Sequence, residues 1–106
     1  MGYLEVFRIR PGETRTMTID FSEKLPTGLG FAASGHSVAS VDKFSGQSDA
    51  SILGSLTPSV SGTDVSAVIL NVGLGERYEV SFTLKMDDAT PPYIVEKVLV
   101  MGVDVL

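Results

Sequence analysis

The strongest constraint on the fold is the stretch YEVSFTLKM, in which apolar and polar side chains alternate without exception. Apolar residues occupy every second position from Tyr78 to Met86, and polar residues fill the positions between them. This period of two matches a β-strand with one buried face and one wet face, whereas a helix would scatter the apolar side chains around its axis. The sequence therefore predicts a strand over residues 78–86.

Other segments have the length and apolar content of strands, and one of them, around Met17, Ile19 and Phe21, repeats the alternation. The further strands are expected over residues 3–9, 16–21, 36–42, 51–56, 65–72 and 94–101. The segments between them, such as RPGE, TPSVSGTD and DDATPP, are rich in the residues that favour turns. No stretch of ten residues carries an apolar stripe at helical spacing, so we expect little helix.

About seven short strands in 106 residues predict an all-β protein, built as an antiparallel β-sandwich. A chain of 11.2 kDa buries about two thirds of its surface on folding, which is enough for a core without metal or disulfide. The sequence has no cysteine, no internal repeat and no linker-like segment. Residues 1–106 are therefore expected to form a single β-sandwich domain.

Charge and hydropathy argue against two classes of partner. Eight basic and thirteen acidic residues give a net charge of −5, which repels phosphate backbones, so we expect no nucleic acid partner. The longest apolar runs, AVIL and VLVM, are far shorter than the roughly 18 residues of a membrane helix, so we expect no membrane partner. The N-terminus lacks the basic and apolar regions of a signal peptide, and we expect the chain to be used from Met1.

The stretch GLGFAASGHSVAS contains two enzyme-like patterns. Gly28, Gly30 and Ala33 match a loose dinucleotide-binding fingerprint, but the flanking sequence predicts neither the buried strand nor the helix that such a loop needs. The residues around Ser37 resemble the nucleophile turn of serine hydrolases, which requires a base histidine elsewhere in the chain. His36 is the only histidine and directly precedes Ser37. We therefore expect a loop leading into a strand, and no enzyme.

The sequence also offers no clear metal or cofactor site. Asp87 and Asp88 are adjacent, but no alternating pattern of oxygen ligands typical of calcium loops surrounds them. One histidine without any cysteine is a poor basis for a zinc site. We expect no metal, no cofactor and no catalytic residue.

The segment GLGERYEVSFTLKMDD places Gly75 three residues before Tyr78 at the start of the alternating strand. This pattern resembles the E–F corner of immunoglobulin-like sandwiches, in which a tyrosine ring enters the core and its hydroxyl bonds an upstream backbone group. Tyr78 and Gly75 are thus the expected structural corner. The fold class that follows from this resemblance is an antiparallel immunoglobulin-like β-sandwich.

Together with TIDFSEKL over residues 18–25, the corner gives the chain a layout that resembles small immunoglobulin-like proteins of bacteriophage tails, the fibre-tail adaptors. A tryptophan that the family often carries in its middle strand is absent. The resemblance implies a non-enzymatic virion protein, a fibre-tail adaptor or a tail or connector accessory component, made in the cytoplasm of the bacterial host. Its partners would be other phage tail, connector or fibre proteins, contacted by symmetric multiple copies. A capsid decoration protein and a carbohydrate-binding module are the alternatives.

The C-terminal segment VLVMGVDVL is apolar on both faces of its expected strand, although a strand with one wet face should alternate. An apolar outer face near a sheet edge invites association. The candidate interface consists of Val98, Val100, Val103, Val105 and Leu106. The alternative is a core strand whose outer side is shielded by another part of the chain, or a bulge at Gly102 that resets the alternation.

Overall fold

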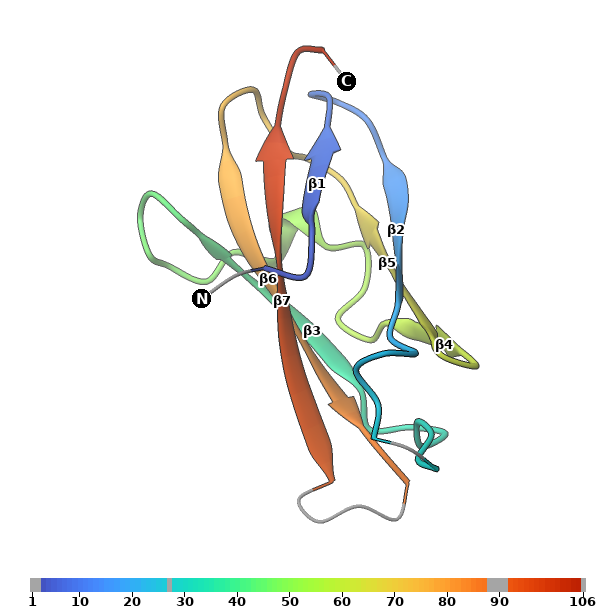
Figure 1. Ribbon diagram of the computed structural model, residues 1–106. Coiled ribbons are helices and arrows are strands. Elements are labelled where there is room, and N and C mark those ends of the chain that lie inside the picture. Colours follow the sequence, from blue (N-terminus) through green and yellow to red (C-terminus); the bar gives the residue numbers. More distant parts are fainter. Residues whose placement is uncertain (1–2, 27, 88–91, 106) are drawn as a thin grey trace.

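The computed structural model describes residues 3–26, 28–87 and 92–105, and it folds them into two β-sheets that face each other (Figure 1). The four-stranded sheet has the order β1-β7-β6-β3, and the three-stranded sheet has the order β2-β5-β4. The elements are β1 (Val6–Ile9), β2 (Arg15–Asp20), β3 (Ser37–Asp42), the short 3₁₀ turn η1 (Ala50–Ile52), β4 (Ser59–Ser61), β5 (Asp64–Ile69), β6 (Arg77–Lys85) and β7 (Tyr93–Gly102). The prediction of an all-β protein is confirmed.

Strand β6, which the alternating sequence predicts, is one of the two inner strands of the larger sheet. It pairs with β7 over its whole length and with β3 along six residues, both in antiparallel register. Val80, Phe82 and Leu84 are fully buried, and the polar residues between them lie on the outer face. The period of two in the sequence therefore corresponds directly to the two faces of this strand.

The hydrophobic core fills the space between the two sheets. The larger sheet contributes side chains such as Phe82 and Val100, and the smaller sheet contributes Met17 and Val65. Phe21, at the end of β2, packs edge to face on Phe82 with ring centroids 6.4 Å apart. Aromatic rings favour this arrangement, so Phe21 joins the two sheets through the core.

One pairing departs from the expected antiparallel sandwich, because β1 runs parallel to β7. The RPGE segment carries the chain from β1 in one sheet to β2 in the other, instead of closing a hairpin within one sheet. Strand β1 therefore pairs with the last strand, which runs in the same direction (Figure 1). Sequence alternation describes the faces of a strand and carries no information on the direction of its neighbour.

The region between β3 and β5 differs from the prediction in two places. Residues 51–56, expected as a strand, begin in η1, where the Asp49 carboxylate accepts a hydrogen bond from the Ser51 N–H at 3.0 Å. Leu53 then makes only an isolated bridge to Ile69. Strand β4, in contrast, lies in TPSVSGTD, where the composition predicts a turn. A strand of three residues is too short for its alternation to be recognised.

Candidate functional site

The predicted corner lies at the start of β6, where the chain arrives from the three-stranded sheet. Tyr78 is only 4% exposed, and its ring belongs to the core cluster. The turn before it contains Gly75 at φ +81°, a conformation that favours glycine. The Gly75 N–H donates to the carbonyl oxygen of Gly102 at 3.0 Å, and the Gly102 N–H donates to the Glu76 carbonyl at 2.9 Å. These bonds join the turn to the end of β7.

The tyrosine hydroxyl makes a different contact from the expected bond to an upstream backbone group. It donates to the Oε1 atom of Glu76 at 2.9 Å, and the same oxygen accepts the N–H of Gly73 at 2.7 Å. The hydroxyl is thus linked to the upstream backbone through a carboxylate. Burial, with a further contribution from the Glu76 carboxylate, raises the pKa of Tyr78 well above its usual range, so the hydroxyl stays protonated as a donor.

The candidate interface on the C-terminal strand needs a correction. Val98 and Val100, expected on an outward face, are fully buried and point into the core. Strand β7 lies between β1 and β6, and it is not an edge strand. The outward residues of β7 are the odd-numbered ones, including Val95, which is 55% exposed. The sequence pattern gives the wrong outward face for β7, because both of its faces carry apolar residues and the alternation does not distinguish them.

The rest of the proposed interface lies beyond β7. Val103 is half-buried, and its N–H donates to the carbonyl oxygen of Ile9 at 3.0 Å, which extends the contact between β7 and β1. Val105 is 74% exposed. Leu106 lies outside the described residues. Only Val105, among the described members of this group, presents most of its side chain to solvent.

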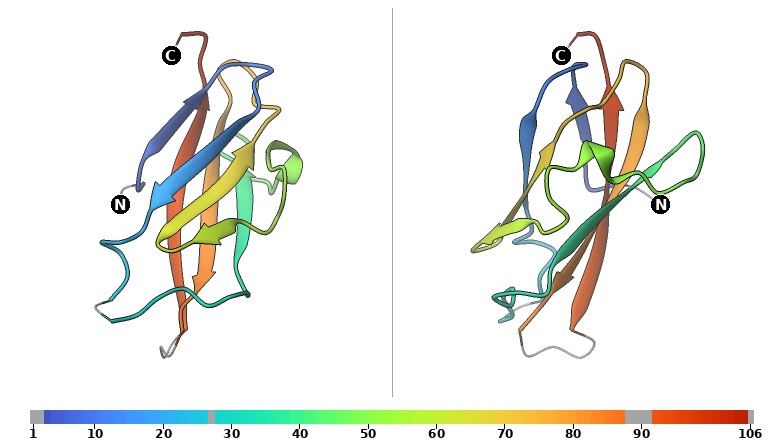
Figure 2. Two further views of the ribbon diagram at one scale, coloured as in Figure 1. Left: turned by 90° about the vertical axis from the view of Figure 1, so that its right-hand side faces the viewer. Right: turned by 180° about the vertical axis from the view of Figure 1, so that it is seen from behind.

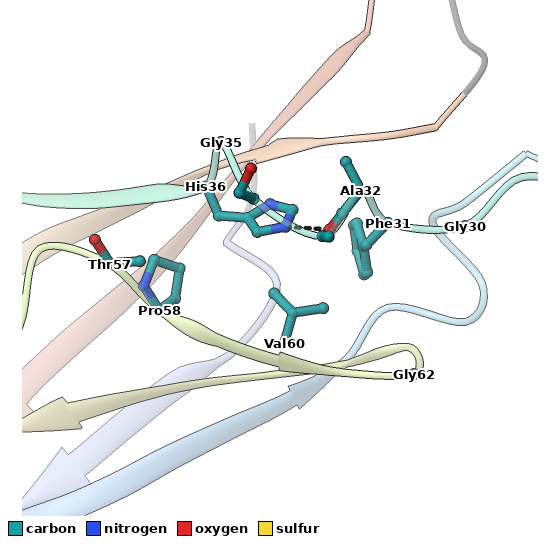
Figure 3. A pocket seen from close by; sticks show the side chains of 11 residues that line it. Gly30, Phe31, Ala32, Gly35, His36, Thr57, Pro58, Val60 and Gly62 are labelled. Carbon is teal, nitrogen blue, oxygen red and sulfur yellow. Dashed lines mark hydrogen bonds between the residues drawn. The ribbon is translucent and has the colours of Figure 1, made fainter.

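The enzyme-like stretch borders a cavity of about 490 Å³ between the loop before β3 and strand β4 (Figure 3). Phe31 and Val60 line it from opposite walls, together with Pro58 and several glycines. Among the described residues that line this cavity, His36 is the only ionisable one. The cavity therefore offers apolar side chains, backbone groups and the two hydroxyl residues Ser34 and Thr57, without another ionisable group beside the imidazole.

Both ring nitrogens of His36 are engaged by backbone groups. Nδ1 accepts the N–H of Lys85 at 3.1 Å, and Nε2 lies 2.8 Å from the Ala32 carbonyl oxygen. A neutral imidazole with its proton on Nε2 satisfies both partners. The side chain is buried and ties the loop to the end of β6, whereas Ser37 is exposed at the start of β3. This geometry gives His36 a structural role in holding the loop.

We expect His36→Ala to lower the free energy of unfolding by about 2 kcal/mol, because the N–H of Lys85 loses its partner. The matched variant Ser37→Ala changes an exposed residue and should stay within about 0.5 kcal/mol of wild type. Urea unfolding of both variants measures the difference. A different result would be that the wild-type protein hydrolyses a generic ester and that Ser37→Ala abolishes this activity. That result would show that the stretch around His36 is catalytic.

A small charged cluster lies on the outer face of β6, around Glu79. Its carboxylate accepts a hydrogen bond from the Tyr3 hydroxyl at 3.0 Å and lies 3.5 Å from the Lys97 ammonium and 3.9 Å from that of Lys43. The hydrogen bond from Tyr3 is the main cause that lowers the pKa of Glu79, and the two lysines add to it. The cluster fastens the segment before β1 to the middle of the sheet.

This cluster predicts a pH dependence of stability. A carboxyl group with a lowered folded-state pKa stabilises the protein above its unfolded-state pKa, and this stabilisation disappears as the pH falls through the lower folded-state value. The loss should therefore begin near pH 4.5, the usual pKa of glutamate, and should amount to less than about 1 kcal/mol because the pairs are partly exposed. Urea midpoints measured from pH 7 to pH 3 should decline less in Glu79→Gln than in wild type. Identical declines would exclude this role.

Within the described ranges, no group of three or more acidic, histidine or cysteine side chains is arranged to hold a metal ion. No helix in the described part of the chain is long and apolar enough to span a membrane. Comparison with known proteins adds no relative, because no family model, no curated protein and no solved structure matches this sequence.

Proposed function

We propose that this chain is a non-enzymatic structural protein of a bacteriophage particle, of the fibre-tail adaptor or tail accessory class, that acts through protein–protein contacts. The observation that carries the proposal is the order of the strands in the two sheets. This order supports the immunoglobulin-like fold that the sequence resemblance implies, and the resemblance in turn suggests the place of the protein in the particle.

The immunoglobulin arrangement places strands A, B, E and D in one sheet and strands C, F and G in the other. If β1 is counted as A and the remaining strands follow in chain order, the smaller sheet reads B-E-D and the larger sheet reads A-G-F-C. Six of the seven strands thus fall in the expected sheet, and the pairings B-E, E-D, C-F and F-G are those of the immunoglobulin arrangement. Only β1 differs, because it lies beside the last strand instead of beside β2.

The corner supports the same assignment. An immunoglobulin-type tyrosine corner occurs near the start of strand F, and Tyr78 is the second residue of β6, the strand that corresponds to F. The corner combines a buried ring with a hydroxyl bonded to the upstream chain. Tyr78 has the buried ring, and its hydroxyl reaches the upstream backbone through the Glu76 carboxylate.

The polar groups of the described residues favour a binding role over catalysis. The one ionisable group in the cavity beside β4 has both of its nitrogens bonded to the backbone. No buried side-chain nitrogen or oxygen of the described residues lacks a hydrogen-bond partner. A rigid sandwich of this kind presents edges and faces to larger partners, and symmetric copies multiply weak contacts into firm attachment.

The test is to delete the gene from the phage genome that encodes it and to examine the particles. We expect the wild-type particle, purified on a density gradient, to contain several copies per tail by mass spectrometry. Deletion should give particles that lack fibres or other tail parts, and expression of the protein from a plasmid should restore them.

Electron microscopy of labelled particles distinguishes the locations. Density on the tail supports the proposal, whereas density on the outer surface of the head would replace it with a capsid decoration role. Absence of the protein from purified particles would overturn the virion assignment altogether.

A further inference from the structure

The two sheets have four edge strands, and three of them are short or covered. The outer edge of β3 is covered by the following segment, since Val38 N–H donates to the Leu56 carbonyl at 3.0 Å and Asp49 N–H donates to that of Ser40 at 3.0 Å. Strand β1 has four residues, and the Arg15 guanidinium donates to the Arg8 carbonyl at 2.8 Å. Strand β4 has only three residues.

The fourth edge belongs to β2, which is six residues long. Figure 2 shows β2 at the margin of the three-stranded sheet, next to β5 on one side only. In the immunoglobulin arrangement the first strand would cover this margin, but here β1 pairs with β7 in the other sheet. No described residue pairs with the outer edge of β2.

The register identifies the backbone groups that this edge presents. Phe21 N–H donates to the Thr63 carbonyl at 2.8 Å, and hydrogen-bonded pairs alternate along an antiparallel ladder. The N–H and C=O groups of Thr16, Thr18 and Asp20 therefore point away from β5. Val68, opposite Thr16, fits this alternation. Its carbonyl points away from β2 and accepts the N–H of Gly54 on the far side of β5.

The edge also lacks the usual protection against strand addition. Natural edge strands are protected by lysines, prolines or bulges, and β2 has none of these between Thr16 and Asp20. Two of its three outward side chains there are threonines, which are favoured in strands, whereas the third, Asp20, is of a type that strands disfavour.

The exposed edge of β2 leads into a groove of about 570 Å³. Residues 3–5 before β1 form one wall, and Ile19, Asp20 and residues 22–24 form the other. The carboxylates of Glu5, Asp20 and Glu23 border the groove with a single cation, that of Lys24. All four side chains are exposed, so the groove has a net negative charge.

From this edge and groove we propose that β2 is a docking site for an extended, basic peptide segment of a partner protein, which adds as a strand beside Thr16, Thr18 and Asp20. The peptide backbone pairs with the unpaired N–H and C=O groups, as in other cases of strand addition. Lysine or arginine side chains of the segment lie against the carboxylates of the groove, and this charge complementarity selects the partner. The inference rests on the strand topology and does not depend on the virion assignment.

Two synthetic peptides test the proposal. One alternates threonine and valine and has a lysine at each end, and the other has glutamates in place of the lysines. With ¹⁵N-labelled protein, the basic peptide should shift the amide resonances of Thr16, Thr18 and Asp20 and slow their hydrogen exchange roughly tenfold or more. The acidic peptide should bind at least about fivefold more weakly.

Variants of β2 separate the backbone contribution from the side-chain contribution. Thr18→Pro removes an N–H that the β2–β5 ladder does not use, so the protein should fold, as circular dichroism and urea unfolding can verify, and peptide binding should be lost. Thr18→Val changes the same side chain but keeps the N–H, and this variant should bind like wild type.

A charge variant tests the groove independently, including the case in which the proline variant does not fold. Asp20→Asn combined with Glu23→Gln should weaken binding of the basic peptide roughly fivefold. The matched control, Glu13→Gln with Asp104→Asn, removes the same charge from two residues that do not line the groove and should change the affinity less than twofold.

Resonance shifts confined to another edge, equal binding of the two peptides, or no response to millimolar peptide would overturn the proposal. A wild-type dimer that Thr18→Pro converts to a monomer would assign the edge to a second copy of the chain and would also overturn it. If purified particles lack this protein, the proposed virion function is refuted, whereas the proposal of a docking site on β2 is unaffected.

Discussion

Val98→Lys and Val100→Lys are each expected to unfold the protein at room temperature. Both valines are fully buried in the core between the two sheets, and no described carboxylate side chain is buried beside them to pair with an ammonium group. Burial of an unpaired charge costs several kcal/mol, which is comparable with the roughly 5–15 kcal/mol that a domain of this size has in total. Far-UV circular dichroism and urea unfolding of the purified variants measure the loss.

Val95→Lys is the matched control on the same strand. Val95 is 55% exposed on the outer face, so its replacement should change the free energy of unfolding by no more than about 0.5 kcal/mol. If the two core variants instead remain as stable as Val95→Lys, the inward face of β7 is assigned incorrectly.

Tyr78→Ala is expected to lower the free energy of unfolding by about 3–5 kcal/mol, as deletion of a buried aromatic ring leaves a cavity that the surroundings fill only in part. The ring lies in the core at the start of β6, where the turn from the other sheet joins the end of β7. Loss of the ring should therefore weaken both the core and this junction. Urea midpoints at neutral pH provide the measurement.

Tyr78→Phe removes only the hydroxyl and separates the ring from its hydrogen bond. We expect a loss of about 1 kcal/mol, because the Oε1 atom of Glu76 keeps the Gly73 N–H and remains accessible to water. Glu76→Gln keeps an acceptor at this position and should cost less than Tyr78→Phe. Urea midpoints of Tyr78→Ala and Tyr78→Phe that both equal the wild-type value would show that this residue does not form a corner.

Strand β6 could be predicted from the sequence because one of its faces is buried against the other sheet and the opposite face is accessible to water. Its side chains then alternate in polarity, and the pattern is long enough to recognise. The same physical reason accounts for β2, where Met17 and Ile19 point inward and the threonines point outward. The buried position of Tyr78 also follows from this alternation.

The remaining features depend on long-range arrangement, which local pattern does not contain. In β7 the outward residues Leu99 and Met101 are as apolar as the buried valines, so the sequence cannot distinguish the faces. The free edge of β2 follows from the parallel pairing of β1 with β7, because β1 can pair with only one of these two strands. The hydroxyl partner of Tyr78 depends on a side chain, Glu76, that reaches back over the turn.

The parallel pairing of the first and last strands determines how a pulling force would act on the molecule. The chain enters β1 at one end of the pair and leaves β7 at the other (Figure 1). Tension applied to the two termini therefore shears β1 along β7, and it loads the bonds from Leu4 N–H to Lys97, from Leu99 N–H to Glu5 and from Val103 N–H to Ile9 together. An antiparallel terminal pair would open these bonds one after another. These hydrogen bonds between the described terminal segments would thus share the force instead of breaking in turn.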